Sequence, residues 1–244
     1  MLVSHEVPRT LLDFSLLFND YDYFLIHQLI KYKEYRDFYK LSKLLGRRQI
    51  LDNSLYELGE SFDPKGYAKM ISELKPAEYL IPDCFNDYSK NIKMFNTWMD
   101  KYGALPGIKI ATVHGETIKE FQKAYDYFCK ADPNIKIAFN FAESLYDTNG
   151  GRVNVIKNVN IDVTRKHHLL GCKTPAEFMA FSDCDWVETI DTSNPVMCAF
   201  EKSRYPTGIK PQLKVDDVQD TLITADLKFS ILTNTTIFKQ LIRE

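Results

Sequence analysis

Apolar residues in the chain gather in short runs, which are separated by longer segments with a helical period. The runs are rich in β-branched and aromatic residues, and this composition favours β-strands. Seven strands are predicted in this way: Tyr23–Leu29, Gln49–Asp52, Glu78–Asp83, Ile108–His114, Ile135–Phe141, His168–Gly171 and Trp186–Asp191.

The segments between these strands are amphipathic and predict helices. In Pro175–Phe181, Thr174 is placed to cap the first turn and Pro175 takes the first helical position. Asp63 and Pro64 open a similar helix, which runs to Leu74. The other predicted helices are Tyr32–Leu45, Asp87–Tyr102 and Thr117–Ala131.

Strands that alternate with helices at this interval predict βαβ units and a parallel sheet. Closing such a sheet into a barrel needs an eighth strand, which we place in Leu222–Leu232. The stretch Asp147–Asn160, which contains Gly150 and Gly151, predicts a loop or a hairpin insertion. We therefore expect an α/β protein with one domain over residues 1–244, folded as a (β/α)8 TIM-like barrel.

The composition limits what the protein can bind. Of its 244 residues, 45% are hydrophobic and 26% are charged, which suits a folded domain. The formal net charge is −2, so a nucleic acid would have to be bound by a local basic patch. The N-terminus lacks a signal-peptide pattern, and no apolar run approaches the about 20 residues of a membrane helix. We expect a cytoplasmic protein of a bacterium or a phage-infected host, with no membrane partner.

The cysteines bear on both redox state and metal binding. They show no CxxC spacing and no nearby histidine in a zinc pattern, so we expect free thiols in a reducing compartment. The five residues are Cys84, Cys129, Cys172, Cys184 and Cys198.

Polar residues end several of the predicted strands. Because the C-terminal strand ends form the catalytic face of a barrel, these side chains are expected to converge on one pocket. The alternative is that Asp, Asn and Gly simply end strands and begin loops. The residues are Asp52 and Asn53, Asp83, His114 and Gly115, Asn140, Gly171, and Asp191.

Three of these strand-end residues are aspartates, namely Asp52, Asp83 and Asp191. Carboxylates that share a pocket perturb each other's protonation and can divide the roles of nucleophile and acid or base. A carboxylate beside a sugar C1′ is the recurring nucleophile of retaining glycosyl transfer. The residues alone therefore favour glycosidic-bond chemistry on a barrel, without a metal.

Short motifs follow one another between Ile50 and Val196. They are Leu51-Asp52-Asn53-Ser54, Pro82-Asp83-Cys84, Val113-His114-Gly115, the segment Ile137–Glu143, His168-Leu169-Leu170-Gly171 with Thr174-Pro175-Ala176-Glu177, and Ile190-Asp191 with Pro195. In order and approximate spacing, they resemble the tRNA-guanine transglycosylase superfamily, especially the small phage-type branch that inserts 7-deazaguanines into DNA. The corresponding family motifs are an Asp-Ser-Gly strand end, an Asp followed by Cys, Val-Gln-Gly-Gly, Gly-Leu-Ala-Val-Gly-Glu, Tyr-Leu-Met-Gly before a Pro-initiated helix, and an Asp followed by Pro.

The resemblance implies a role for each matched residue. Asp191 would attack the nucleoside C1′ and form a covalent intermediate, Asp52 would move protons on the leaving and incoming base, and Asp83 would hydrogen-bond the purine edge. His114 and Gly115 would lie against the base carbonyl, and Leu170 on the base face. The full set of substrate-binding candidates is Asp83, Cys84, His114, Gly115, Asn140, Leu170 and Gly171. Alternatively, Leu170 is ordinary core and His114 is a strand-end histidine with partners of its own.

The chain departs from the family pattern in several places. The tRNA enzymes of the family carry a zinc site of three Cys and one His after the nucleophile, whereas Cys198 stands alone here. His114 stands where Gln is usual, and Asn140 and Phe141 stand where the tRNA enzymes have Val-Gly. We therefore predict neither zinc nor another cofactor, and the departures put a tRNA substrate in doubt.

Basic and aromatic residues occur together in two segments, a composition that suits phosphate contact and base stacking. In Tyr32–Arg48, Glu34 and Asp37 balance the charge, and we favour a solvated helix face. Beyond Asp191, the candidates for phosphate contact are Lys202, Arg204, Lys210 and Lys214, with Tyr205 between them. Chemistry on a duplex base also requires flipping that base into a pocket.

The leading hypothesis is a base-exchanging transglycosylase. It would replace guanine in DNA by a 7-deazaguanine such as preQ0 or a derivative, through a covalent Asp191–nucleoside intermediate. The alternatives are a related enzyme that acts on tRNA or on a free nucleoside, and a non-catalytic paralogue that binds nucleic acid or supports a catalytic partner. The identity of the base, the sequence context and the oligomeric state stay open.

Overall fold

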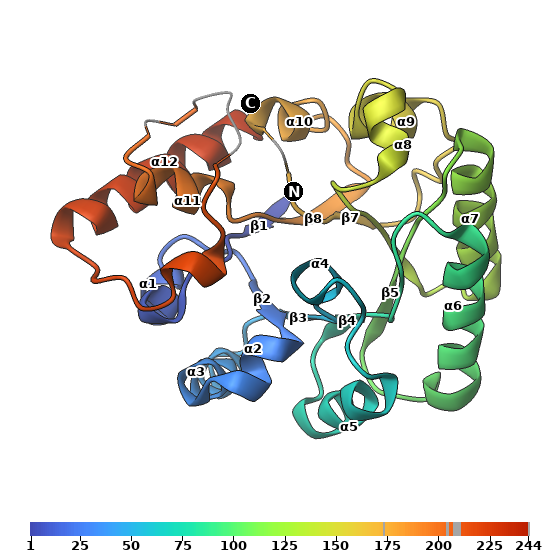
Figure 1. The fold of residues 1–244 in the computed structure, drawn as a ribbon, viewed down its shortest axis with the longest axis horizontal. Helices are drawn as coiled ribbons and strands as arrows, with labels where there is room; N and C mark the ends of the chain where they lie inside the picture. The colour runs from blue at the N-terminus through green and yellow to red at the C-terminus, as the bar shows by residue number, and fades with distance from the viewer. Residues whose placement is uncertain (173, 204, 207–210, 244) are drawn as a thin grey trace.

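The chain folds into a nearly closed (β/α)8 TIM-like barrel, seen in a computed structural model that describes residues 1–172, 174–203, 205–206 and 211–243 (Figure 1). Within these residues, the strands form one parallel sheet in the order β1-β8-β7-β6-β5-β4-β3-β2. The strands are β1 Leu2–Ser4, β2 Asp22–Leu25, β3 Gln49–Asp52, β4 Glu78–Leu80, β5 Ile108–Thr112, β6 Lys136–Phe139, β7 His167–Leu169 and β8 Val187–Asp191.

Most of the helices lie outside the sheet, whereas the short helix α4, Leu55–Leu58, lies within the ring of strands in the view of Figure 1. Side chains of Asp63, Asp87, Thr117 and Thr224 accept a backbone N–H in the first turn of α5, α6, α7 and α12, which fixes where these helices begin. The helices are α1 Leu12–Ser15, α2 Ile26–Lys31, α3 Lys33–Leu44, α4 Leu55–Leu58, α5 Pro64–Leu74, α6 Tyr88–Tyr102, α7 Ile118–Ala131, α8 Ser144–Thr148, α9 Arg152–Lys157, α10 Pro175–Met179, α11 Asn194–Phe200 and α12 Ala225–Leu241, with 3-10 turns at Arg9–Leu11 and Val215–Val218.

The predicted alternation of strands and helices is confirmed, but the eighth strand was placed wrongly. Most of Leu222–Leu232 belongs to α12, which Thr224 caps. The missing strand is β1, at the opposite end of the chain, and it pairs with β8 from Leu2↔Thr189 to Ser4↔Asp191. A strand of three residues is too short for its alternation to be read from the sequence.

Two further boundaries differ from the prediction. The strand predicted over Tyr23–Leu29 ends at Leu25, because the chain turns into α2 at Ile26. The segment predicted as a loop or hairpin, Asp147–Asn160, contains α9, and only the turn around Gly150 and Gly151 has the positive φ angles of a loop.

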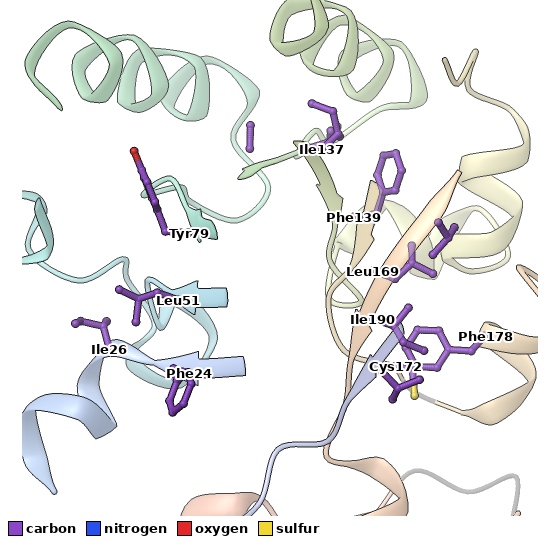
Figure 2. Packing of buried hydrophobic residues seen from close by; sticks show 14 of the residues in the cluster. Phe24, Ile26, Leu51, Tyr79, Ile137, Phe139, Leu169, Cys172, Phe178 and Ile190 are labelled. Atoms are coloured by element: carbon purple, nitrogen blue, oxygen red, sulfur yellow. The ribbon is translucent and has the colours of Figure 1, made fainter. Parts of the chain in front are cut away.

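The apolar core lies in two layers. Inside the barrel, Tyr23, Leu25, Ile50, Leu80 and Ile110 pack together, and Leu170 lies against them. The larger layer lies between the strands and the helices, and Figure 2 shows part of it, including Phe24, Leu51, Tyr79, Phe139, Leu169 and Ile190. Alternating residues of one strand thus serve opposite faces, as Tyr23 and Phe24 do.

Charged groups fill the N-terminal end of the barrel interior. Lys136 Nζ lies 3.2 Å from Glu78 Oε2 and 2.9 Å from Glu188 Oε2, and Arg48 pairs with both carboxylates. Lys136 and Glu78 are almost fully buried. Because opposite charges face each other here, each ion is paired where water is largely excluded.

None of the described helices has the length and apolarity needed to span a membrane.

Candidate active site

A cavity of about 430 Å³ opens at the C-terminal ends of the strands. Asp52, Asp83 and Asp191 all line it, although Asp52 ends β3, Asp83 lies in the loop after β4 and Asp191 ends β8. All three side chains are at least nine-tenths buried. The predicted convergence of the three aspartates is therefore seen in the structure.

Asp52 is held by two donors on its own side of the barrel. The hydroxyl of Tyr23 donates to Oδ2, and the backbone N–H of Ser54 donates to Oδ1. Ser54 reaches this position with a φ of 62°, in the left-handed region. Burial raises the pKa of Asp52 to about 7, against the two hydrogen bonds and with help from the charges of Asp83 and Asp191. Asp52 can therefore exchange a proton near neutral pH.

Asp191 ends β8 and faces a second group of donors. Nε2 of His168 lies 3.0 Å from Asp191 Oδ1, and the N–H of Gly171 lies 3.4 Å from the same oxygen. Glu6, from the loop after β1, also hydrogen-bonds to Asp191, and its backbone N–H donates to the carbonyl of Thr192 at 3.2 Å. Burial and the charge of Asp191 raise the pKa of Glu6 well above its usual range. Glu6 thus holds a proton beside Asp191.

Asp83 belongs to a chain of three ionisable groups. His114 Nε2 lies 2.7 Å from Asp83 Oδ2, and His114 Nδ1 contacts Glu143 Oε1. Although burial opposes a charge on His114, its hydrogen bonds to the two carboxylates raise its pKa to about 9. His114 is therefore an imidazolium at neutral pH, and it offsets part of the negative charge of the cavity floor.

The other oxygen of Asp83 is also held. Asn53 Nδ2 donates to Asp83 Oδ1 at 2.8 Å, and the hydroxyl of Ser61 lies 3.3 Å from that oxygen. The Asp83 N–H donates to Ser61 Oγ at 2.9 Å. Since neutral donors and one cation surround this carboxylate, its position in the cavity is fixed before any ligand arrives.

His114 lines the cavity, but both of its ring nitrogens are engaged by Asp83 and Glu143. Asn140 is similarly engaged, because its amide contacts Glu143 and its Oδ1 accepts the Ala142 N–H at 2.7 Å. These two residues therefore shape the floor of the cavity and hold the carboxylates.

The remaining predicted contacts divide into two groups. Leu170 and Gly171 line the cavity, and Gly171 has a φ of 57°. A Cβ at Gly171 would lie 2.4 Å from the ring of Phe141, so the close approach requires glycine. Cys84 and Gly115 are buried but are not among the described residues that line the cavity.

The predicted phosphate-binding residues are only partly described. Lys202 is exposed just after α11, with a φ of 55°, and does not line the cavity. Arg204 and Lys210 lie outside the described residues. Lys214 does line the cavity and places Nζ 5.8 Å from the ring centre of Tyr56. Of the predicted phosphate-binding residues that the structure describes, Lys214 is therefore the one that lines the cavity.

Sequence reasoning missed three groups that contact Asp52 or Asp191, and a fourth, Glu143, that contacts His114. Tyr23 and His168 lie on predicted strands, and Glu143 ends one of the matched motifs, so their positions carried a signal. Glu6 carried none, because its segment was assigned to no element. Each group becomes recognisable only when the strands are placed side by side.

Comparison with protein-family models and with curated proteins finds no match to this chain. Among the described residues, no group of three or more His, Cys, Asp and Glu side chains is arranged to hold a metal ion.

Proposed function

We propose that this protein is a transglycosylase that exchanges guanine for a 7-deazaguanine base in DNA, through a covalent intermediate on Asp191. The observation that carries the proposal is the pairing of two buried carboxyl groups with different environments in one cavity. Asp52 has a pKa of about 7, whereas Asp191 is held by His168, Gly171 and Glu6. Such a difference divides acid–base work from nucleophilic work.

In the first half-reaction, a carboxylate oxygen of Asp191 attacks C1′ of the deoxyguanosine. The bond between C1′ and N9 breaks, and its electron pair remains with the base. Protonated Asp52 transfers its proton to the departing guanine. The products are a covalent Asp191–sugar ester, neutral guanine and an Asp52 carboxylate.

In the second half-reaction, the 7-deazaguanine enters the same cavity. The Asp52 carboxylate removes the proton from its N9, and N9 forms the new bond to C1′. The ester bond to Asp191 breaks and restores the carboxylate. Two displacements at the same carbon retain the configuration at C1′, and Asp52 regains the proton it donated.

Asp83 suits recognition of the base. Its carboxylate is a pure hydrogen-bond acceptor, already oriented by Asn53 and His114. The N–H groups on the Watson–Crick edge of guanine and of 7-deazaguanines are donors that such an acceptor would select. Binding the base in a cavity at the end of a barrel agrees with the need to flip it out of the duplex.

DNA is preferred over tRNA because the chain lacks the zinc-site segment of the family's tRNA enzymes. Labelled guanine and labelled preQ0 should enter DNA and not tRNA in a side-by-side exchange assay. Incorporation only into tRNA would give the tRNA alternative, and exchange on a free nucleoside alone would give the nucleoside alternative.

The mechanism predicts different outcomes for Asp191→Asn and Asp52→Asn. Asp191→Asn keeps the shape of the side chain but loses the nucleophile, so it should bind DNA, form no adduct and lose exchange by several orders of magnitude. Asp52→Asn should exchange slowly and still form some adduct, because the nucleophile remains. A denaturing gel of protein, DNA and base separates the two cases, since a covalent adduct survives denaturation.

Two further variants complete this experiment. Asp83→Asn should form adduct while its selectivity among bases weakens. Asp37→Asn, on the exposed face of α3, is the matched control and should behave as the wild type does. Adduct from Asp191→Asn but not from Asp52→Asn would exchange the two roles, and full exchange by both variants would refute the site and favour a non-catalytic protein.

A further inference from the structure

Strand β7 begins with two consecutive histidines whose side chains face opposite sides of the sheet. His168 points into the barrel, is fully buried, and places Nε2 3.0 Å from Asp191 Oδ1. His167 packs outward against Tyr125 and Phe139, with its ring parallel to both. The inward histidine therefore touches a reactive carboxylate, whereas its neighbour belongs to the outer layer of the core.

The second nitrogen of His168 is tied to the charged end of the barrel. His168 Nδ1 lies 2.9 Å from Thr189 Oγ1, which in turn lies 2.5 Å from Lys136 Nζ. An ammonium group can only donate, so Thr189 Oγ1 accepts from Lys136. Asp191 Oδ1, as a carboxylate oxygen, can only accept, so Nε2 of the neutral His168 carries the ring proton and Nδ1 accepts the hydroxyl proton of Thr189.

We propose that His168 is a positioning residue for Asp191, and that Thr189 and Lys136 hold it as the Nε2–H tautomer. The inference rests on the proposed function for what Asp191 does, but the chain of hydrogen bonds can be tested without it. A donor fixed from below restricts rotation of the carboxylate, so that Asp191 meets C1′ in one orientation.

The charge of His168 also matters for the nucleophile. Burial and the nearby charge of Lys136 lower the pKa of His168, whereas its hydrogen bond to Asp191 acts to raise it. The net effect is a lowered pKa. A neutral imidazole orients Asp191 without cancelling its negative charge, whereas an imidazolium would weaken it as a nucleophile.

The ring of His168 is also held on its face. It stacks on Tyr23, with ring centres 5.8 Å apart and planes 11° from parallel. The hydroxyl of Tyr23 donates to Asp52. Two neighbouring rings therefore each hold one of the two reactive carboxylates, so a change in the tilt of either ring would move both.

His167 supplies an internal reference, because its surroundings demand the opposite tautomer. Its Nδ1 lies 2.9 Å from the carbonyl oxygen of Arg165, which can only accept, so Nδ1 carries the proton. Its Nε2 lies 3.0 Å from the hydroxyl of Tyr125, whose oxygen already accepts the N–H of Asp162. The hydroxyl of Tyr125 therefore donates to Nε2.

The first test is nitrogen-15 NMR of the full chain with labelled histidine, which distinguishes protonated from unprotonated ring nitrogens. His168 should be protonated at Nε2 and His167 at Nδ1, with signals assigned by their loss in His168→Gln and His167→Gln. Thr189→Val removes the hydroxyl and should weaken the preference of His168 for the Nε2–H tautomer, which Asp191 alone then favours. A proton on Nδ1 of His168 in the wild type, or one on both nitrogens at neutral pH, overturns the proposal.

The second test compares adduct formation by His168→Gln and His168→Leu. Glutamine retains an N–H donor near the position of Nε2 and should remain within about tenfold of the wild-type rate, whereas leucine should lose about 100-fold at saturating DNA with KM unchanged. His167→Gln is the matched control and should keep the wild-type rate. Equal losses in both His168 variants, or a loss confined to KM, overturn the positioning role.

The two tests separate the proposals. A wild-type protein that forms no adduct with DNA and base refutes the proposed function, whatever the NMR spectrum shows. The tautomer of His168 and its response to Thr189→Val decide independently whether Lys136 and Thr189 orient the imidazole.

Discussion

At the scale of single residues, the chemistry depends on where protons reside among closely spaced acids. Burial raises the pKa of Asp52 to about 7. Hydrogen bonds to two carboxylates raise the pKa of His114 to about 9, although its burial acts in the opposite direction. Glu6 holds its proton beside Asp191, and the hydroxyl of Tyr23 donates to Asp52. Neutral hydrogen-bond donors thus contact Asp52 and Asp191, whereas the charged His114 lies between Asp83 and Glu143 at the floor of the cavity.

The pKa of Asp52 predicts how the rate of the proposed reaction depends on pH on the alkaline side. In the proposed mechanism the departure of guanine requires protonated Asp52, and the protonated fraction of Asp52 falls as the pH rises through about 7. Single-turnover adduct formation should therefore decline above that pH, approaching about tenfold per pH unit. The same measurement on Asp52→Asn should give a slow rate without this decline. A decline that persists in Asp52→Asn belongs to another group and contradicts the assignment.

At the scale of elements, the site depends on a helix that the sequence pattern concealed. Asn149, Gly150 and Gly151 indicate a turn, and they led us to expect a loop throughout, yet α9 starts immediately after them. Its first residue, Arg152, is almost fully buried and donates to the carbonyls of Phe139, Leu170 and Gly171, at 2.8 to 2.9 Å. A charged residue after a glycine pair gives no sign that it will be buried, so this contact could not be foreseen.

Arg152→Lys should show what this contact contributes. Arg152 also donates to Glu177 at 2.7 Å, and a lysine ammonium cannot span all four acceptors. Urea unfolding should show a loss of about 3 kcal/mol, since a buried charge and its partners lose their geometry. Base exchange should weaken through KM, because Leu170 and Gly171 line the cavity.

Arg36→Lys is the matched control for this experiment. Arg36 is exposed, and its guanidinium donates to the carbonyl of Ile30 at 3.3 Å. The free energy of unfolding should change by less than about 0.5 kcal/mol. If Arg152→Lys is as mild as Arg36→Lys, the guanidinium does not hold the loop after β7.

At the scale of the whole molecule, the sequence predicted the alternation of strands and helices correctly, but not the strand that closes the barrel. Buried parallel strands with polar ends are visible as local patterns, so seven strands and three converging aspartates could be found in advance. Closure and the proton-holding partners depend on contacts between distant segments. β1, close to the N-terminus, pairs with β8, which ends at Asp191, and His168 of β7 contacts Asp191 of the neighbouring strand. No local pattern encodes such contacts.

The structure shows how the barrel is closed between its first two strands. The described chain has no strand pairing between β1 and β2, and individual contacts take its place. Asp20 accepts the N–H of Val3 at 3.0 Å through Oδ2 and donates its own N–H to the Val3 carbonyl at 2.8 Å. One residue further along, the N–H of Tyr23 donates to Ser4 Oγ at 3.1 Å. At this seam between β1 and β2, the hydroxyl of Ser4 therefore replaces the backbone carbonyl that would accept the hydrogen bond in a regular sheet.

Ser4→Ala should weaken the barrel at this seam. The substitution removes the acceptor of a buried N–H on β2, and such an unsatisfied donor costs about 1–3 kcal/mol. Urea unfolding should show this loss, and hydrogen exchange should speed up at Tyr23 and along β1. Ser72→Ala, on the exposed side of α5, is the matched control, and its free energy of unfolding should stay within about 0.5 kcal/mol of the wild type.

Because Tyr23 holds Asp52 and β1 leads into Glu6, the seam also supports the two proton-bearing sides of the cavity. Exchange activity should therefore fall in Ser4→Ala more than in Ser72→Ala, even at temperatures where both remain folded. Equal stability and equal activity in the two variants would mean that the hydrogen bond from Tyr23 to Ser4 contributes nothing to the contact between β1 and β2.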